Sequence, residues 1–99
     1  MIIGDPKGLI IETNAAFLNM LGYYPEEFEK GLNCIDITPP EFLEKEAKTI
    51  SEIYKTGSAP PIEKEFFHKN GSRVPVIISG IKISEEDQTI LCIVIDLRV

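Results

Sequence analysis

The four residues Lys69-Asn70-Gly71-Ser72 separate two apolar runs of strand length, Glu63 to His68 and Arg73 to Ile83. Asn-Gly between two such runs is the strongest short-range signal for a β-hairpin, because both residues tolerate the positive φ angles of a tight turn. A second glycine-centred turn, Asp5-Pro6-Lys7-Gly8, joins two apolar runs near the start of the chain. The two hairpins predict one sheet that takes strands from both ends of the chain, with the middle of the chain packed against it.

The segment after the first hairpin predicts two short helices. Asn14 can accept a hydrogen bond from a free backbone N–H and so cap a helix over Ala15 to Leu21, which Gly22 can end in the left-handed conformation. Pro25 to Glu29 is typical of a second helix, since proline suits the first helical position and acidic residues suit the positive end of the helix dipole. The next segment is predicted to form a short turn of helix or an irregular loop, from Leu32 to Thr38.

The one long helix is predicted to begin at Thr38. In this interpretation Thr38 caps the helix, Pro39 takes the first position and Glu41 completes a capping box. Gly57 ends it. Apolar residues recur along it at four-, three- and four-residue spacing and form one stripe, namely Leu43, Ala47, Ile50 and Tyr54. The stripe predicts that this helix covers the sheet.

The last strand, Thr89 to Leu97, is apolar on both sides. An antiparallel sheet with one solvated face should alternate apolar and polar residues, and this one does not. The residues of its second face are Ile77, Ile81, Ile83, Leu91, Ile93, Ile95 and Leu97. Because exposed apolar patches of this size mark interfaces, we expect a second copy of the domain, in a homodimer, or a flanking helix to pack there. The alternative explanation is strand propensity alone, which favours isoleucine and valine anywhere in a sheet.

Composition limits the classes of protein. The 99 residues suffice for one domain with a modest core. A net charge of -6 with scattered basic residues argues against a nucleic-acid partner, and no stretch is long enough to span a bilayer. Cys34 and Cys92 lie in apolar segments and are expected to be reduced core thiols. We therefore expect a cytoplasmic domain without membrane contact, excised from a larger protein because residues 1–99 begin and stop at strands.

An ordered set of positions runs through essentially the whole chain: Asp5, Gly8, Ile10, Asn14, Phe17, Gly22, Tyr23, Glu26, Glu27, Phe28, Gly31, Pro40, Glu41, Gly57, Lys69, Asn70, Gly71 and Asp96. No single piece is specific, but the ordered set resembles the PAS domain family. The resemblance implies an α+β fold, a five-stranded antiparallel sheet in the order 2-1-5-4-3 with helices covering one face. It also implies a role in sensing a small molecule, light, oxygen or redox state, or in pairing proteins. The usual flanking domains would be histidine kinases, diguanylate cyclases or transcription regulators.

Two positions depart from the family pattern. Tyr24 stands before Pro25 where the family has a small hydroxyl residue that caps the helix. Asp96 and Leu97 match the end of the family's last strand, but Arg98 replaces the threonine that hands the signal to a following helix. The resemblance therefore gives no secure route for signal transfer through that contact.

A flavin is disfavoured as cofactor. Gly31-Leu32-Asn33-Cys34 resembles the start of the motif that carries the reactive cysteine in light-oxygen-voltage domains, a PAS subfamily. The remainder is Ile35-Asp36-Ile37-Thr38, where the subfamily has Arg-Phe-Leu-Gln, so the arginine that contacts the flavin phosphate is missing. The sheet positions that would hydrogen-bond the ring hold Phe66, Val76 and Val94. Leaving the polar atoms of a buried ring unpaired is costly.

Haem, metal and catalytic sites are also disfavoured. The resemblance implies that a haem ligand would be a histidine on the long helix, and residues 41 to 57 contain none. His68 is expected to be a solvated turn residue, and one histidine with two distant cysteines makes no metal site. The acidic groups at residues 26–27 and 85–87 are expected to be helix-start charges and a solvated loop, and no nucleophile motif is present. We therefore expect no cofactor and no enzyme activity.

An apolar pocket remains. Its expected lining is Phe17, Leu21, Ile35, Ile50, Ile53 and Tyr54 on one side, and Phe66, Val76, Ile78, Cys92 and Val94 on the other. Any ligand would be small and mostly apolar, because few polar groups are available to orient it. The expected function is a PAS sensory or interaction module of a multidomain signalling protein, in which ligand binding shifts the packing of the outer sheet face. The alternative is a ligand-free dimerisation domain whose pocket is filled by its own side chains.

Overall fold

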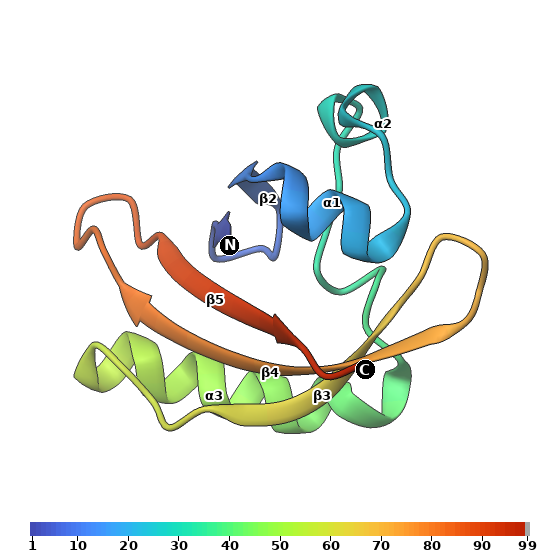
Figure 1. The fold of residues 1–99 in the computed structure, drawn as a ribbon. Coiled ribbons are helices and arrows are strands. Elements are labelled where there is room, and N and C mark those ends of the chain that lie inside the picture. Colours follow the sequence, from blue (N-terminus) through green and yellow to red (C-terminus); the bar gives the residue numbers. More distant parts are fainter. Residues whose placement is uncertain (99) are drawn as a thin grey trace.

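In the computed structural model, which describes residues 1–98, one antiparallel sheet takes strands from both ends of the chain (Figure 1). The strands are β1 (Ile2–Gly4), β2 (Ile10–Thr13), β3 (Ile62–Phe67), β4 (Arg73–Lys82) and β5 (Ile90–Asp96), in the order β2-β1-β5-β4-β3. The helices are α1 (Ala15–Leu21), α2 (Pro25–Glu29) and α3 (Leu43–Thr56), with a 3-10 turn, η1 (Pro40–Phe42), before α3. The predicted fold class and strand order are confirmed.

Side-chain hydrogen bonds build both predicted hairpin turns. Asn70 Oδ1 accepts hydrogen bonds from the backbone N–H of Ser72 at 2.9 Å and from its hydroxyl at 2.6 Å. Asp5 Oδ1 accepts from the backbone N–H groups of Lys7 at 2.8 Å and Leu9 at 3.0 Å. In each turn, the side chain of Asn or Asp thus holds the backbone of the residues that follow it, as these residue types commonly do in turns. The first turn joins β1 to β2, and the other edge of β1 pairs with β5, where Ile2 is the partner of Cys92 in the ladder.

The helix boundaries follow the sequence, with one exception. Asn14 caps α1 by accepting the N–H of Phe17 at 3.1 Å, as predicted. The prediction that Thr38 caps the long helix is wrong: the chain first makes the 3-10 turn, and α3 begins only at Leu43. The Thr38 hydroxyl instead donates to the carbonyl of Cys34 at 2.7 Å and accepts from Lys64 at 2.7 Å. A contact with a distant strand therefore replaces the local capping box.

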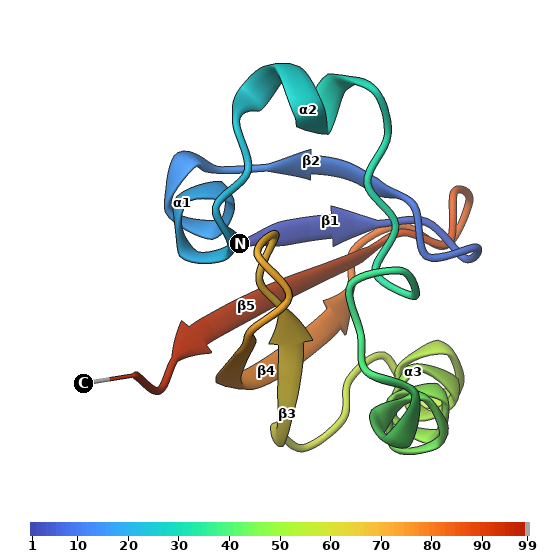
Figure 2. The same cartoon turned by 90° about the vertical axis from the view of Figure 1, so that its right-hand side faces the viewer.

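The helices divide between the two ends of the sheet's inner face. Figure 2 shows α1 and α2 beside β1 and β2, while α3 lies at the opposite end, and the segment between α2 and α3 runs down beside the sheet. Beneath α1 the packing is close, with the ring of Phe17 edge-on to Phe66 at 5.7 Å between centroids. Beneath α3 the packing is looser, and the helix itself contributes one buried residue, Ile53. The core is therefore dense at one end of the sheet and sparse at the other.

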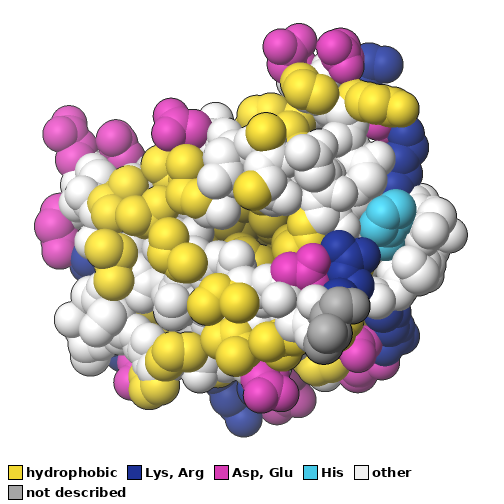
Figure 3. Space-filling view, viewed as in Figure 1, with side chains coloured by type: hydrophobic (Ala, Val, Ile, Leu, Met, Phe, Trp, Pro, Cys, Tyr) yellow, Lys and Arg dark blue, Asp and Glu magenta, His cyan; other side chains and the backbone are white. Residues whose placement is uncertain are grey.

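The outer face of the sheet is apolar and uncovered in the single chain. Of its seven predicted residues, Ile81, Ile83, Ile93, Ile95 and Leu97 are exposed, and Ile77 and Leu91 are half-buried. Figure 3 shows hydrophobic side chains gathered over β4 and β5 on the face turned away from α3. The predicted distribution of apolar residues on both faces is confirmed, and the occupant of the outer face stays a prediction. No helix within residues 1–98 has the length and apolar character needed to cross a membrane.

Candidate functional site

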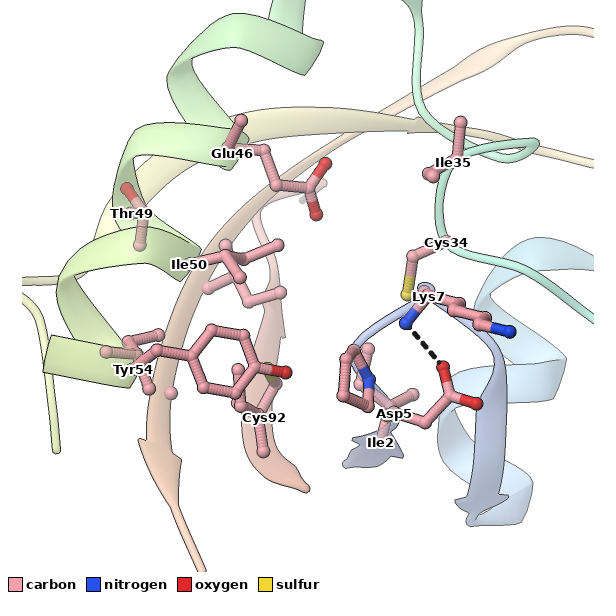
Figure 4. A pocket seen from close by; sticks show the side chains of 18 of the residues that line it. Ile2, Asp5, Lys7, Cys34, Ile35, Glu46, Thr49, Ile50, Tyr54 and Cys92 are labelled. Atoms are coloured by element: carbon pink, nitrogen blue, oxygen red, sulfur yellow. Dashed lines mark hydrogen bonds between the residues drawn. The ribbon is translucent and has the colours of Figure 1, made fainter. Parts of the chain in front are cut away.

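A cavity of about 350 Å³ lies between α3 and the turn that joins β1 to β2 (Figure 4). Helix α3 supplies one wall with Leu43, Glu46, Ala47, Thr49, Ile50, Ile53 and Tyr54. The sheet supplies the floor, mainly with Ile2, Ile62, Ile78, Gly80, Ile90 and Cys92. Residues 5–8 and the pair Cys34 and Ile35 close the opposite side. This size and mostly apolar lining are typical of small-molecule sites.

The structure divides the predicted pocket residues into two groups. Six line the cavity: Ile35, Ile50, Ile53, Tyr54, Ile78 and Cys92. The other five lie in the dense core beyond it: Phe17, Leu21, Phe66 and Val76 are buried, and Val94 packs against them. The division has a simple cause, since α1 packs directly on the sheet and leaves no space there. The apolar stripe predicted for the long helix faces the cavity at all four positions.

The wall opposite α3 is held rigidly by Asn33. Its Nδ2 donates to the carbonyl of Lys7 at 3.2 Å, and its Oδ1 accepts the N–H of Ile35 at 2.8 Å. The N–H of Cys34 also donates to the carbonyl of Gly8 at 2.8 Å. A Cβ at Gly8 would lie 2.8 Å from Asn33 Oδ1, so this close approach requires glycine. The segment that resembles a flavin-binding motif therefore serves here to fasten a loop to the first hairpin.

Helix α3 is attached to the sheet mainly near its ends. Lys45 Nζ donates to the carbonyl of Glu63 at 2.9 Å near one end. Near the other end, the Tyr54 hydroxyl donates to the carbonyl of Gln88 at 2.9 Å, and Lys82 Nζ donates to the carbonyl of Tyr54 at 3.1 Å. Between these attachments, α3 faces the cavity with Ala47, Thr49, Ile50 and Ile53.

A buried lysine lies behind one end of the cavity. The Lys64 side chain is 0% exposed, and its Nζ lies 2.8 Å from Glu46 Oε2 and 2.7 Å from Thr38 Oγ1. The ammonium also lies 4.1 Å from the centre of the Phe66 ring, a cation–π contact. Burial lowers the pKa of Lys64, and the Glu46 carboxylate opposes that shift. The cluster of Thr38, Glu46 and Lys64 joins the loop before η1, helix α3 and strand β3.

Sequence analysis missed this cluster, although a signal was available. Side chains alternate between the faces of a strand, so residues two apart share a face. Phe66 was placed on the inner face, and Lys64 lies two residues before it. Lys64 must therefore point inward too, where a charged group needs a partner. Glu46 was available as that partner, because it lies three residues after Leu43 and four before Ile50 and so shares the face of the apolar stripe.

The two cysteines and the single histidine were the remaining candidates for a reactive or metal-binding role. Burial raises the pKa of Cys34 to about 12 and that of Cys92 to about 11, and the Glu46 carboxylate adds to both shifts. Both cysteines are free. His68 lies between β3 and the second turn, half-buried rather than free in solvent, with Nδ1 accepting the N–H of Asn70 at 3.1 Å. Within residues 1–98, no three His, Cys, Asp or Glu residues group as a metal site.

The whole described chain, residues 1–98, matches the PAS domain family. The chain belongs to the PAS domain family. A curated relative, the hybrid signal transduction protein dokA of Dictyostelium discoideum, is 35% identical over 92 residues. Those residues make up 92% of this PAS domain and 6% of that protein, so the domain spans only a small part of its relative.

A solved structure has the same fold as this PAS domain. It is a domain of the sensory box sensor histidine kinase/response regulator from Geobacter sulfurreducens, with a TM-score of 0.74. The similarity covers 96% of this chain and 80% of that one, at 24% sequence identity. The resemblance drawn from the sequence is thus confirmed for family and fold.

The C-terminal departure from the PAS pattern has a structural counterpart. Arg98 forms an ion pair with Asp96, at 2.8 Å between Nη2 and Oδ2. The same Nη2 donates to the carbonyl of Met20 in α1 at 3.1 Å. Where the family pattern has threonine, this PAS domain therefore fixes the end of β5 to α1.

Proposed function

We propose that this PAS domain is a sensory module of a signal-transduction protein and binds a small, mostly apolar molecule in the cavity beneath α3. The observation that carries the proposal is the cavity itself, about 350 Å³ in a domain whose other core positions are closely packed. A ligand in an apolar cavity of this size would gain many van der Waals contacts with its walls. The names of the Dictyostelium and Geobacter proteins, both signalling proteins, support the same class of function.

A path from the cavity to the outer face passes through Gly80. A Cβ there would lie 3.1 Å from Ile53 Cδ1, so α3 approaches β4 at this glycine. The next residue, Ile81, points to the outer face and is the ladder partner of Leu91. A ligand that moves Ile53 would change the packing at Gly80 and so the geometry of the outer face. Binding would then shift the population between two packings of that face.

A ligand-free dimerisation domain is the second candidate, favoured by the exposed apolar residues of the outer face. In that case the cavity would serve no ligand and the outer face alone would act. The two functions differ in whether the cavity has an occupant, and both include a homodimer or a flanking domain on the outer face.

Native mass spectrometry of the purified protein tests the proposal. We expect a co-purified molecule of small mass on the wild type and its loss in Ala47→Leu, which adds a side chain inside the cavity. Lys48→Ala is the matched control, because Lys48 neighbours Ala47 but its side chain is 78% exposed. A wild type that carries no added mass and binds no apolar probe would favour the ligand-free candidate.

A further inference from the structure

The cavity has one fixed polar end, formed by Glu46. Figure 4 shows this carboxylate pointing from α3 into the gap in front of Cys34 and Ile35. Its Oε2 accepts a hydrogen bond from Lys64 at 2.8 Å. Its Oε1 makes no hydrogen bond to any group within residues 1–98 and is open to the cavity, since every buried side-chain oxygen of these residues has a partner. The cavity therefore offers one strong acceptor whose protein partners are incomplete.

The nearest donors are directed at other acceptors, so Glu46 Oε1 stays open to the cavity. Lys64 divides its protons between Glu46 and Thr38, and the Thr38 hydroxyl proton is directed to the carbonyl of Cys34. At the other side of the cavity, the Tyr54 hydroxyl proton is directed to the carbonyl of Gln88, which leaves only lone pairs for a ligand. Glu46 and Tyr54 thus present acceptors to the cavity, which Lys7, Thr49 and Ser79 also line.

The charges near Glu46 also favour a ligand group that donates a hydrogen bond. At both cysteine sulfurs, the Glu46 carboxylate raises the pKa more strongly than the Lys64 ammonium lowers it. The rim carries one carboxylate and one ammonium group, those of Asp5 and Lys7. Lys64 is behind Glu46 and does not line the cavity. A group bound next to Glu46 would therefore meet the carboxylate first, which disfavours an anion there and favours a hydrogen-bond donor.

We propose that the ligand of this site is a mostly apolar molecule with one hydrogen-bond donor, a hydroxyl or an ammonium group, directed at Glu46 Oε1. The inference rests on the proposed function and adds the chemical class of the ligand. A carboxylate directed at Glu46 is disfavoured by charge repulsion. Ethers and other molecules with acceptors only would exclude water from Glu46 Oε1 without supplying a donor, which costs binding free energy.

The test uses probes of equal length that differ at one end. They are 1-octanol, octylamine and 1-methoxyheptane, which has the heavy-atom count of 1-octanol but no donor. We expect isothermal titration calorimetry at neutral pH to show that 1-octanol and octylamine bind at least ~10-fold more tightly than 1-methoxyheptane, the effect of one hydrogen bond to a charged group.

The decisive variant removes both charges together. Glu46→Leu with Lys64→Met replaces a buried ion pair by apolar groups, a change that often preserves stability, so the fold survives where Glu46→Leu alone would leave Lys64 buried and unpaired. In the double variant we expect the preference for 1-octanol to fall to within about twofold of the ether, because no acceptor remains. Glu44→Gln is the matched control on α3, since its side chain is 87% exposed and lies outside the cavity, and it should keep the wild-type preference.

The outcomes separate the two proposals. Equal affinity of the wild type for 1-octanol and 1-methoxyheptane would overturn the ligand class while leaving the cavity a binding site. A preference retained in the double variant would show that Glu46 is not the acceptor. Absence of binding by all three probes would overturn both the ligand class and the cavity's proposed function.

Discussion

Gly22 and Gly57 both end helices in the left-handed conformation, with φ of 83° and 95°, but only Gly22 has a side chain packed over it. A Cβ at Gly22 would lie 2.5 Å from His68 Cε1, whereas one at Gly57 would meet nothing within 4 Å. We expect Gly57→Ala to lower the free energy of unfolding by about 1–2 kcal/mol, the cost of left-handed backbone. Gly22→Ala should cost roughly 1–3 kcal/mol more through overpacking.

Urea unfolding of both variants measures this difference. A third variant combines Gly22→Ala with His68→Ala. Removing the His68 ring should recover part of the extra free energy of unfolding that Gly22→Ala loses. Equal losses at the two glycines would show that His68 moves aside freely and does not fix the end of α1.

The two cysteines should react slowly despite their place beside a cavity. Because burial raises the pKa of Cys34 to about 12 and that of Cys92 to about 11, the reactive thiolate is scarce at pH 8. We expect alkylation by iodoacetamide to be at least ~100-fold slower than for an ordinary thiol, and to accelerate with pH beyond the point where a free thiol has fully ionised. Mass spectrometry follows the reaction, with urea-unfolded protein as control. Rapid alkylation of the folded protein at pH 8 would contradict the raised pKa of both thiols.

At the scale of elements, the ion pair of Glu46 and Lys64 joins α3 to β3. Removing one partner leaves a buried charge, while removing both does not. We expect Glu46→Leu to lower the free energy of unfolding by about 3–5 kcal/mol, because the Lys64 side chain is 0% exposed. The double variant with Lys64→Met should lie close to the wild type. Denaturant unfolding checks this, and additive losses in the double variant would refute a direct coupling between the two elements.

Most elements could be predicted because their signals are local. The Asn14 cap, the Gly22 end of α1 and the Asn70-Gly71 turn each depend on residues within a few positions, and the structure confirms all three. The start of α3 was predicted wrongly because Thr38 makes its contact with Lys64, 26 residues further along the chain. A capping motif in the sequence does not show that a distant strand competes for the same hydroxyl.

The candidate site was half predictable for a related reason. Helical spacing identified the wall formed by Ile50 and Tyr54, and strand alternation identified Ile78 and Cys92. Periodicity gives the face of an element but not the distance to the element opposite, so Phe17 could not be assigned to the dense core. The position of the cavity depends on the spacing between α3 and the first hairpin, which only the assembled fold defines.

At the scale of the whole molecule, we expect the outer sheet face to govern association. Ile93 and Ile95 in β5 are 49% and 55% exposed, and they point away from the cavity. We expect the protein to dimerise through this face and Ile93→Glu to weaken the dimer by about 10-fold or more, because a charge would enter an apolar contact. Tyr24→Ser is the control, since Tyr24 is 67% exposed beside α2 and away from the sheet. Light scattering during size-exclusion chromatography measures the mass, and a wild type that remains monomeric at high concentration would contradict the prediction.

We propose that sensing depends on the cavity beneath α3 and its link to the outer face. A titration of the ¹⁵N-labelled protein with 1-octanol, followed by two-dimensional NMR, tests both at once. We predict saturable shifts for the amides of Ile53, Gly80 and Cys92, accompanied by smaller shifts on the outer face at Ile81. Shifts that do not saturate, or that are confined to the outer face while the amides around the cavity stay unchanged, would contradict it.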